Sequence, residues 1–141
     1  MTEPHFMTIA EASAAIRARS LSPVELTQSF LSRIKALDGQ LDSYLMVLEE
    51  TALAVAKQAE QEIAAGRWKG PLHGIPIGLK DIYNTAGVRT TGHSALFKDH
   101  IPTEDAATVT LLRKAGAIVL GKLATWEFAI ERGPRSRIAV W

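Results

Sequence analysis

One lysine ends an apolar stretch in GIPIGLKDIYNTAG, residues 74–87. If residues 75–79 form a strand, the aliphatic side chains share one face, and Pro76, Gly78 and Lys80 share the other. Burial favours the neutral form of an amine, and a neutral amine can take a proton from a serine hydroxyl. This pattern is compatible with Lys80 as a general base. The alternative is that Lys80 emerges from the strand end into water, as long basic side chains commonly do.

The residues on either side of Lys80 refine this prediction. Gly78 has no side chain, so another backbone or a substrate could approach the strand closely there. Asp81 should point to the opposite face from Lys80 and need not be its ion-pair partner.

Length and composition predict an ordinary globular chain. The 141 residues are enough for roughly one domain, with 47% hydrophobic and 22% charged residues and a net charge of +1. No basic block indicates nucleic-acid binding. The absence of cysteine excludes disulfides and thiolate chemistry and fits a reducing compartment. With no secretory signal at the start and no apolar run long enough for a bilayer, we expect a soluble, cytoplasmic protein without membrane contact.

The first third of the chain, 1–69, is expected to be mainly helical. Thr8 and Glu11 have capping-box spacing before a helix over about 9–18. A stronger start follows in Ser22, Pro23 and Glu25, which predicts a second helix to about residue 36, where Asp38 and Gly39 break the pattern. After a short strand at 44–48, a third helix is predicted over 50–65, ending at Gly66.

The next part, 70–130, has the order of an α/β protein. A strand at 75–79 precedes a polar loop at 83–104. Thr103 or Asp105 would cap a helix over about 106–115. The following run AIVL, 117–120, predicts a buried strand, and another helix begins within 125–130.

Two long segments resemble the amidase signature family. They are GPLHGIPIGLKDIYNTAGVRTTGHSAL, residues 70–96, and DAATVTLLRKAGAIVLGKLATWEFA, residues 105–129. The resemblance covers about residues 8–130 and extends to the amidase-like subunits of glutamyl-tRNA amidotransferases. It implies the N-terminal part of an α/β amidase fold, with a helix-covered mixed sheet. The chain 1–141 would then be one incomplete domain: a helical region, the start of the amidase core and a divergent tail at 131–141.

The same resemblance implies hydrolysis of amide C–N bonds by a Ser–cis-Ser–Lys triad. Lys80 occupies the position of the family lysine, the general base. The nucleophilic and bridging serines match nothing here, because only IERGPRSRIAVW follows the Glu-Phe-Ala motif and it has no glycine-serine cluster. We therefore expect a truncated or frameshifted chain that is inactive alone. The alternative is a non-catalytic remnant or interaction module.

We expect no cofactor and no metal. The expected ligand of the parent enzyme is a small-molecule amide. Its expected protein partners are a second copy of the chain or the other subunits of an amidotransferase, and no nucleic acid is expected.

Other residues that could take part in catalysis or binding are expected to have structural roles. GAIVLGK resembles part of a P-loop, but Leu123 lacks the required hydroxyl, so Lys122 is expected in an ordinary loop. Ser94 lacks a full nucleophile elbow and is expected to be a turn hydroxyl. It could still line the parent enzyme's site together with Thr90 and Thr91.

The remaining polar and aromatic candidates are expected to have structural roles, and not catalytic or binding roles. The four histidines, at positions 5, 73, 93 and 100, lack metal-ligand spacing. Glu104 and Asp105 are expected at a helix N-terminus rather than as a catalytic pair. The aromatic residues Trp68, Trp126 and Phe128 are expected to pack rather than to form a binding site.

Overall fold

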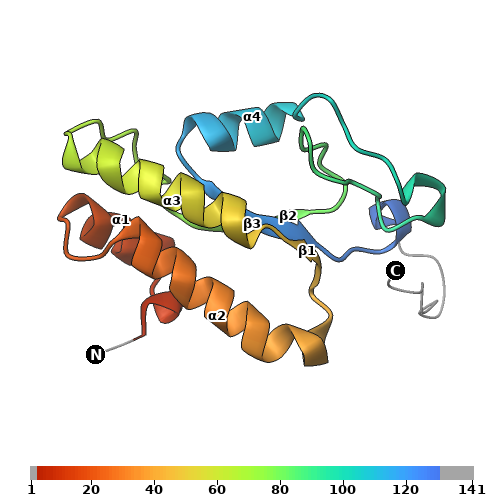
Figure 1. Ribbon diagram of the computed structural model, residues 1–141, viewed down its shortest axis with the longest axis horizontal. Coiled ribbons are helices and arrows are strands. Elements are labelled where there is room, and N and C mark those ends of the chain that lie inside the picture. The colour runs from red at the N-terminus through yellow and green to blue at the C-terminus, as the bar shows by residue number, and fades with distance from the viewer. Residues whose placement is uncertain (1–2, 131–141) are drawn as a thin grey trace.

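A small mixed sheet forms the centre of the molecule. The computed structural model describes residues 3–130, and the predicted divergent tail, 131–141, lies outside them. Strand order is β1-β3-β2, with β1 (Tyr44–Val47) antiparallel and β2 (Pro76–Lys80) parallel to β3 (Ile118–Leu123). In Figure 1, α2 and α3 run across the sheet and α4 lies beyond α3, next to the long loop that follows β2. The predicted fold class, helices followed by a helix-covered mixed sheet, is confirmed.

The first two helices begin where the capping residues predict. α1 (Ile9–Arg17) has a complete capping box, in which the Glu11 backbone N–H donates to Thr8 Oγ1 and the Glu11 carboxylate accepts from the Thr8 N–H. α2 (Pro23–Leu41) is preceded by Ser22, whose hydroxyl accepts from the Val24 N–H at 2.9 Å. These local bonds satisfy N–H groups that have no partner within the helix.

The predicted end of α2 near residue 36 is wrong. The helix continues through Asp38 and Gly39 to Leu41, and Asp42 then adopts a left-handed conformation. Glycine costs only about 1 kcal/mol inside a helix, which tertiary packing can offset. The Asp38 carboxylate accepts hydrogen bonds from the Ser43 and Tyr44 N–H groups, so it orders the chain after the helix.

β3 extends beyond the predicted strand at 117–120 and includes Lys122. The prediction that Lys122 lies in a loop is therefore wrong. Lys122 pairs with Met46 of β1 and with Leu79 of β2, so β3 is paired on both sides at this position. A strand that is paired on both sides satisfies its backbone groups, so its length depends on its neighbours as well as on its own apolar run.

The core lies between the helices and the sheet. α3 (Glu49–Ala64) is the third predicted helix, within one residue at each end. One cluster joins Ile16 of α1, Leu26 of α2 and Ile63 of α3 to Ile75, the residue just before β2. The other joins α2 and α3 to β3; its buried members are Leu31, Ala52, Ala56, Ile118 and Leu120. Small alanines on α3 allow that helix to lie close to the strand.

Two predictions about the later part of the chain are wrong. α4 (Ala107–Lys114) has no side-chain cap, because the Asp105 carboxylate instead accepts from the Ala86 N–H and pairs with Arg113. The helix predicted within 125–130 is only a 3-10 turn, Glu127–Ala129. Phe128 and Ala129 have φ values of 51° and 58°, which a continuing right-handed helix cannot accept.

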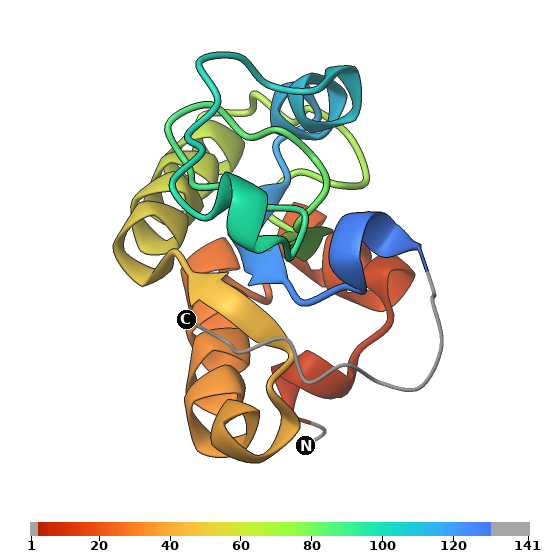
Figure 2. The ribbon, with the colours of Figure 1, turned by 90° about the vertical axis from the view of Figure 1, so that its right-hand side faces the viewer.

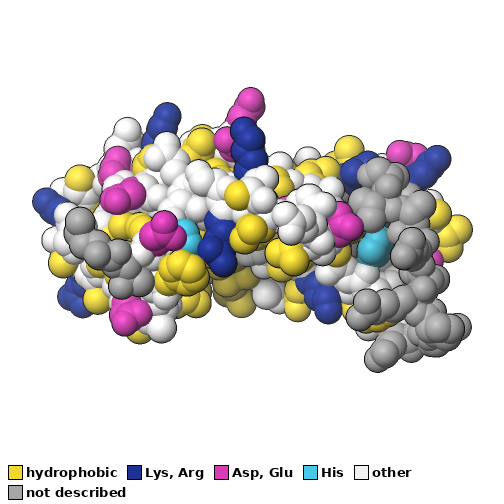
Figure 3. Space-filling view, turned by 90° about the horizontal axis from the view of Figure 1, so that it is seen from below, with side chains coloured by type: hydrophobic (Ala, Val, Ile, Leu, Met, Phe, Trp, Pro, Cys, Tyr) yellow, Lys and Arg dark blue, Asp and Glu magenta, His cyan; other side chains and the backbone are white. Residues whose placement is uncertain are grey.

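The surface carries charges of both signs. On the face shown in Figure 3, the described lysine, arginine, aspartate and glutamate side chains are interspersed and no single-sign stripe is visible. No helix within residues 3–130 combines the length and apolar character that crossing a membrane requires.

Candidate active site

Lys80 lies at the carboxyl end of β2, at the edge of the sheet. It pairs with Leu123 of β3, and its side chain is exposed. Gly78 is two residues earlier, on the same face, and a β-carbon there would lie 2.8 Å from Leu123 Cδ1. The space at Gly78 is thus filled by the Leu123 side chain, and not by the backbone or substrate that the sequence suggested. Lys80 therefore projects from the sheet beside a closely packed neighbouring strand.

Asp81 turns away from Lys80 into the protein, as predicted. Only 1% of Asp81 is exposed. Its Oδ2 accepts from the Thr91 backbone N–H at 2.9 Å and from the Thr91 hydroxyl at 2.6 Å. Its backbone also takes part, since its N–H donates to Leu123 O and its carbonyl accepts from the Gly92 N–H. The first residue after β2 is therefore held on both sides.

Lys122 is a second lysine at the same end of the sheet, and it is buried. It is 1% exposed, and its Nζ donates to Tyr83 O at 2.6 Å and to Thr90 Oγ1 at 2.7 Å. Asp81 Oδ1 lies 3.5 Å away. Burial lowers the pKa of Lys122, whereas the Asp81 carboxylate acts in the opposite direction.

The loop after β2 folds back over the strand ends, as Figure 2 shows for the green segment. Thr90, Thr91 and Ser94 are all buried in it. The Ser94 hydroxyl donates to Glu127 Oε1 at 2.6 Å and accepts from the Leu96 N–H. Ser94 is thus a turn hydroxyl, as predicted, and it joins this loop to the 3-10 turn at 127–129.

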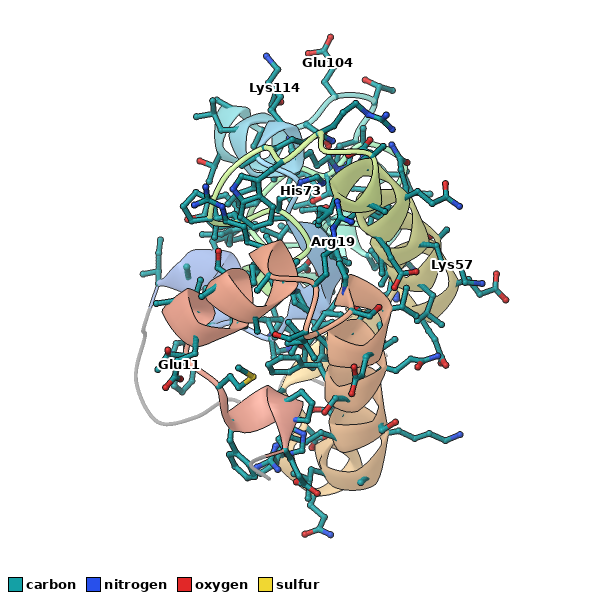
Figure 4. The ribbon with its side chains drawn as sticks, turned by 90° about the vertical axis from the view of Figure 1, so that its left-hand side faces the viewer. Glu11, Arg19, Lys57, His73, Glu104 and Lys114 are labelled. Carbon is teal, nitrogen blue, oxygen red and sulfur yellow. The ribbon has the colours of Figure 1, made fainter. Side chains whose placement is uncertain are left out.

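His73 is part of the interior. Figure 4 shows it between α3 and α4, whereas Lys114 and Glu104 project outward. Its Nε2 lies 3.0 Å from Glu62 Oε2, and its Nδ1 accepts from the Lys69 N–H. Burial lowers the pKa of His73, and the basic group of Lys69 acts in the same direction. In the part of the chain that the structure describes, no three His, Asp or Glu side chains converge as metal ligands would.

The motifs and their spatial arrangement agree with comparisons against known proteins. The family model described as "Amidase" matches residues 25–136. The chain belongs to the Amidase family. Its sequence is 46% identical, over 123 residues, to the putative amidase AmiD of Mycobacterium tuberculosis (strain ATCC 25618 / H37Rv), covering 87% of this chain and 26% of that protein. It is also 42% identical to a glutamyl-tRNA(Gln) amidotransferase subunit from Geobacter sp. (strain M21), over 88% of this chain and 25% of that protein.

Solved amidase structures support the same assignment. The native peptide amidase of Stenotrophomonas maltophilia superposes with a TM-score of 0.83 at 38% identity, covering 90% of this chain and 26% of that structure. The resemblance to the amidase signature family and the partial amidase fold are thus confirmed. This Amidase-family chain spans about a quarter of the length of the curated relatives it matches.

The buried polar group around Lys122 was not predicted from the sequence. Alternation along the strand does not signal it, because 117–120 is apolar throughout and the pairing of β3 with β2 shifts register before Lys122. The acceptors around it could not be identified, since the threonines and the Tyr83 carbonyl belong to a loop with no periodic pattern. Lys80 was identified by its motif, and the structure adds its exposure and strand pairing.

Proposed function

We propose that this chain provides the general base of a serine amidase, and that the base is Lys80. The observation that carries the proposal is the position of Lys80: an exposed amine at the carboxyl end of a strand in the amidase fold, followed by an anchored aspartate. Ligands of α/β proteins commonly bind at the carboxyl ends of strands. Asp81 is engaged elsewhere, so the Lys80 amine has no competing carboxylate from its neighbour.

In the proposed reaction, a serine hydroxyl attacks the carbonyl carbon of the amide. Its proton passes through a bridging serine to the neutral amine of Lys80. Backbone N–H groups would stabilise the oxyanion, with one donor worth roughly 2.7–4 kcal/mol at comparable sites. The C–N bond then breaks as the leaving nitrogen takes the proton, and water releases the acyl group from the serine.

This chain is proposed to be inactive by itself. Its 141 residues contain no glycine-serine cluster that would correspond to the two family serines. On this proposal, the nucleophilic and bridging serines come from additional polypeptide.

The wider biochemical setting is also proposed. A small-molecule amide is the proposed substrate. Names of relatives support an amide substrate, or a role within an amidotransferase that has partner subunits. The cysteine-free composition is compatible with the cytoplasm. The two activities are distinguished by whether ammonia from glutamine is released to water or transferred to a second substrate.

A chimera provides the test. Residues 3–130 would replace the superposed segment of the Stenotrophomonas maltophilia peptide amidase, and hydrolysis of a peptide amide would be measured. We expect activity that Lys80→Ala reduces by at least 1000-fold, whereas Lys57→Ala, at an exposed position of α3, changes it less than twofold. A serine-reactive fluorophosphonate should label the chimera and leave the isolated chain unlabelled. Hydrolysis that persists in the Lys80→Ala chimera would refute the assignment.

A further inference from the structure

Lys122 connects both ends of one loop through a single ammonium group. Its Nζ contacts Tyr83 O and Thr85 Oγ1 at the start of this loop, and Thr90 Oγ1 near its end, at 2.6, 3.3 and 2.7 Å. Residues 81–94, which we call the Lys80 loop, begin directly after Lys80. Three N–H donors on one cation thus hold together a segment that contains no helix or strand of the sheet.

The ammonium of Lys122 lies in a buried polar environment of three oxygen acceptors and one carboxylate. Lys122, Asp81 and Thr85 are each no more than 1% exposed. A buried charge is costly unless it is paired and hydrogen-bonded, and Lys122 has both kinds of partner. Asp81 Oδ1 has no hydrogen bond in the structure, but it lies 3.5 Å from this amine. The carboxylate and the ammonium therefore compensate each other inside the protein.

Lys80 is flanked by residues that depend on this arrangement. Leu79, just before it, is the strand partner of Lys122, and Asp81, just after it, faces the Lys122 amine. The Asp81 N–H donates to Leu123 O, directly after Lys122 along β3. Lys80 itself projects to the opposite face of the sheet, so Lys122 acts on its backbone and not on its amine.

We propose that Lys122 is a positioning residue for Lys80: its ammonium anchors the Lys80 loop and thereby fixes the backbone from which the base projects. The catalytic meaning of this inference rests on the proposed function. The structural coupling can be measured without turnover, so its failure is distinguishable from a failure of the amidase assignment.

The test is amide hydrogen exchange and carbon chemical shifts measured by NMR on the full 141-residue chain. In Lys122→Met, which retains the length and apolar character of the side chain, the Asp81 and Gly92 amides should exchange at least tenfold faster. The Cα resonance of Lys80 should also shift towards its unfolded value. Amides of α2 and α3, which report the global loss of stability, should accelerate at least tenfold less than the Asp81 and Gly92 amides. The same substitution at exposed Lys114 should change none of these signals.

Chemical rescue separates positioning by the ammonium from simple packing. Lys122→Ala should show the same local loss, and methylammonium should restore slow Asp81 exchange in a saturable way. Tetramethylammonium, which has the charge but no N–H donor, should not restore it. Restoration by both cations would refute a specific role for the N–H groups.

Two results would overturn the proposal. One is a Lys122→Met chain whose Lys80 and Asp81 signals match wild type. The other is a uniform loss of protection throughout the chain, which would make Lys122 a general stabilising residue. If Lys122→Met does not fold, Thr90→Val decides instead. It removes one acceptor of the ammonium, and unchanged Lys80 and Asp81 signals in that variant would refute the coupling.

Discussion

The imidazole of His73 occupies the space that a side chain at residue 116 would need. A β-carbon on Gly116 would lie 2.4 Å from Cδ2 of His73 and 3.1 Å from its Cα. Gly116 also has a φ of +83°, which L residues rarely adopt. The turn between α4 and β3 is therefore fitted to the histidine that precedes β2, and residues 43 positions apart in sequence depend on each other (116 − 73).

Gly116→Ala should destabilise the chain by about 2–4 kcal/mol, the sum of left-handed strain and a core overlap. Gly66→Ala is the matched control, because Gly66 has a φ of +78° but nothing within 4 Å of its added β-carbon. That variant should lose only about 1 kcal/mol. Urea unfolding of the three chains measures the difference. Equal losses of unfolding free energy in both variants would mean that the His73 side chain moves aside without destabilising the chain.

Gly121 allows β1 to approach β3. Its added β-carbon would lie 2.1 Å from the carbonyl oxygen of Met46. Because backbone cannot move aside as a flexible side chain does, Gly121→Ala should cost about 3 kcal/mol. Gly39→Ala, at an exposed position inside α2 with nothing within 4 Å, should stabilise the chain by about 0.5–1 kcal/mol. Thermal unfolding should show a lower Tm for Gly121→Ala and a higher Tm for Gly39→Ala. An unchanged Tm in Gly121→Ala would contradict the close packing of β1 against β3.

Ionisation of Glu62 makes the stability of the fold depend on pH. The Lys69 ammonium and the Gln58 amide, with His73, lower the pKa of Glu62 from 4.5 to about 2. A carboxylate with a lowered folded pKa stabilises the protein above its unfolded pKa, and this contribution is lost as pH falls from about 4.5 towards 2. Glu62→Gln should remove about 1 kcal/mol at pH 7 and flatten the dependence in that range. Denaturant unfolding of both chains between pH 7 and pH 2 tests this, and parallel curves would contradict it.

Lys80 should be replaceable without loss of stability. Its side chain is exposed, and substitutions at exposed positions usually change unfolding free energy by no more than about 0.5 kcal/mol. Lys80→Met should therefore unfold at the wild-type denaturant concentration. Lys122→Met should unfold at a lower denaturant concentration, because it leaves the Asp81 carboxylate buried without its cation. A loss at Lys80 as large as that at Lys122 would contradict the exposure difference between them.

Short-range sequence signals were sufficient to predict where the first two helices begin and to which family the chain belongs. The Thr8–Glu11 box and the Ser22–Pro23 start are satisfied within a few residues, so their spacing is enough to predict them. The motif around Lys80 likewise identified an amidase relative. Local signals failed where distant partners compete for a group: Asp105 caps no helix because Ala86 and Arg113 engage it.

Which of two lysines at the same end of the sheet is buried depends on the folded chain as a whole. Both follow an aliphatic run, and nothing in either segment specifies what covers it. Lys122 is enclosed because a loop from elsewhere in the chain brings Tyr83 O, Thr90 and Asp81 to its amine, whereas Lys80 receives no such cover among residues 3–130. Burial of a charge requires hydrogen-bond partners supplied in three dimensions, which sequence spacing does not encode.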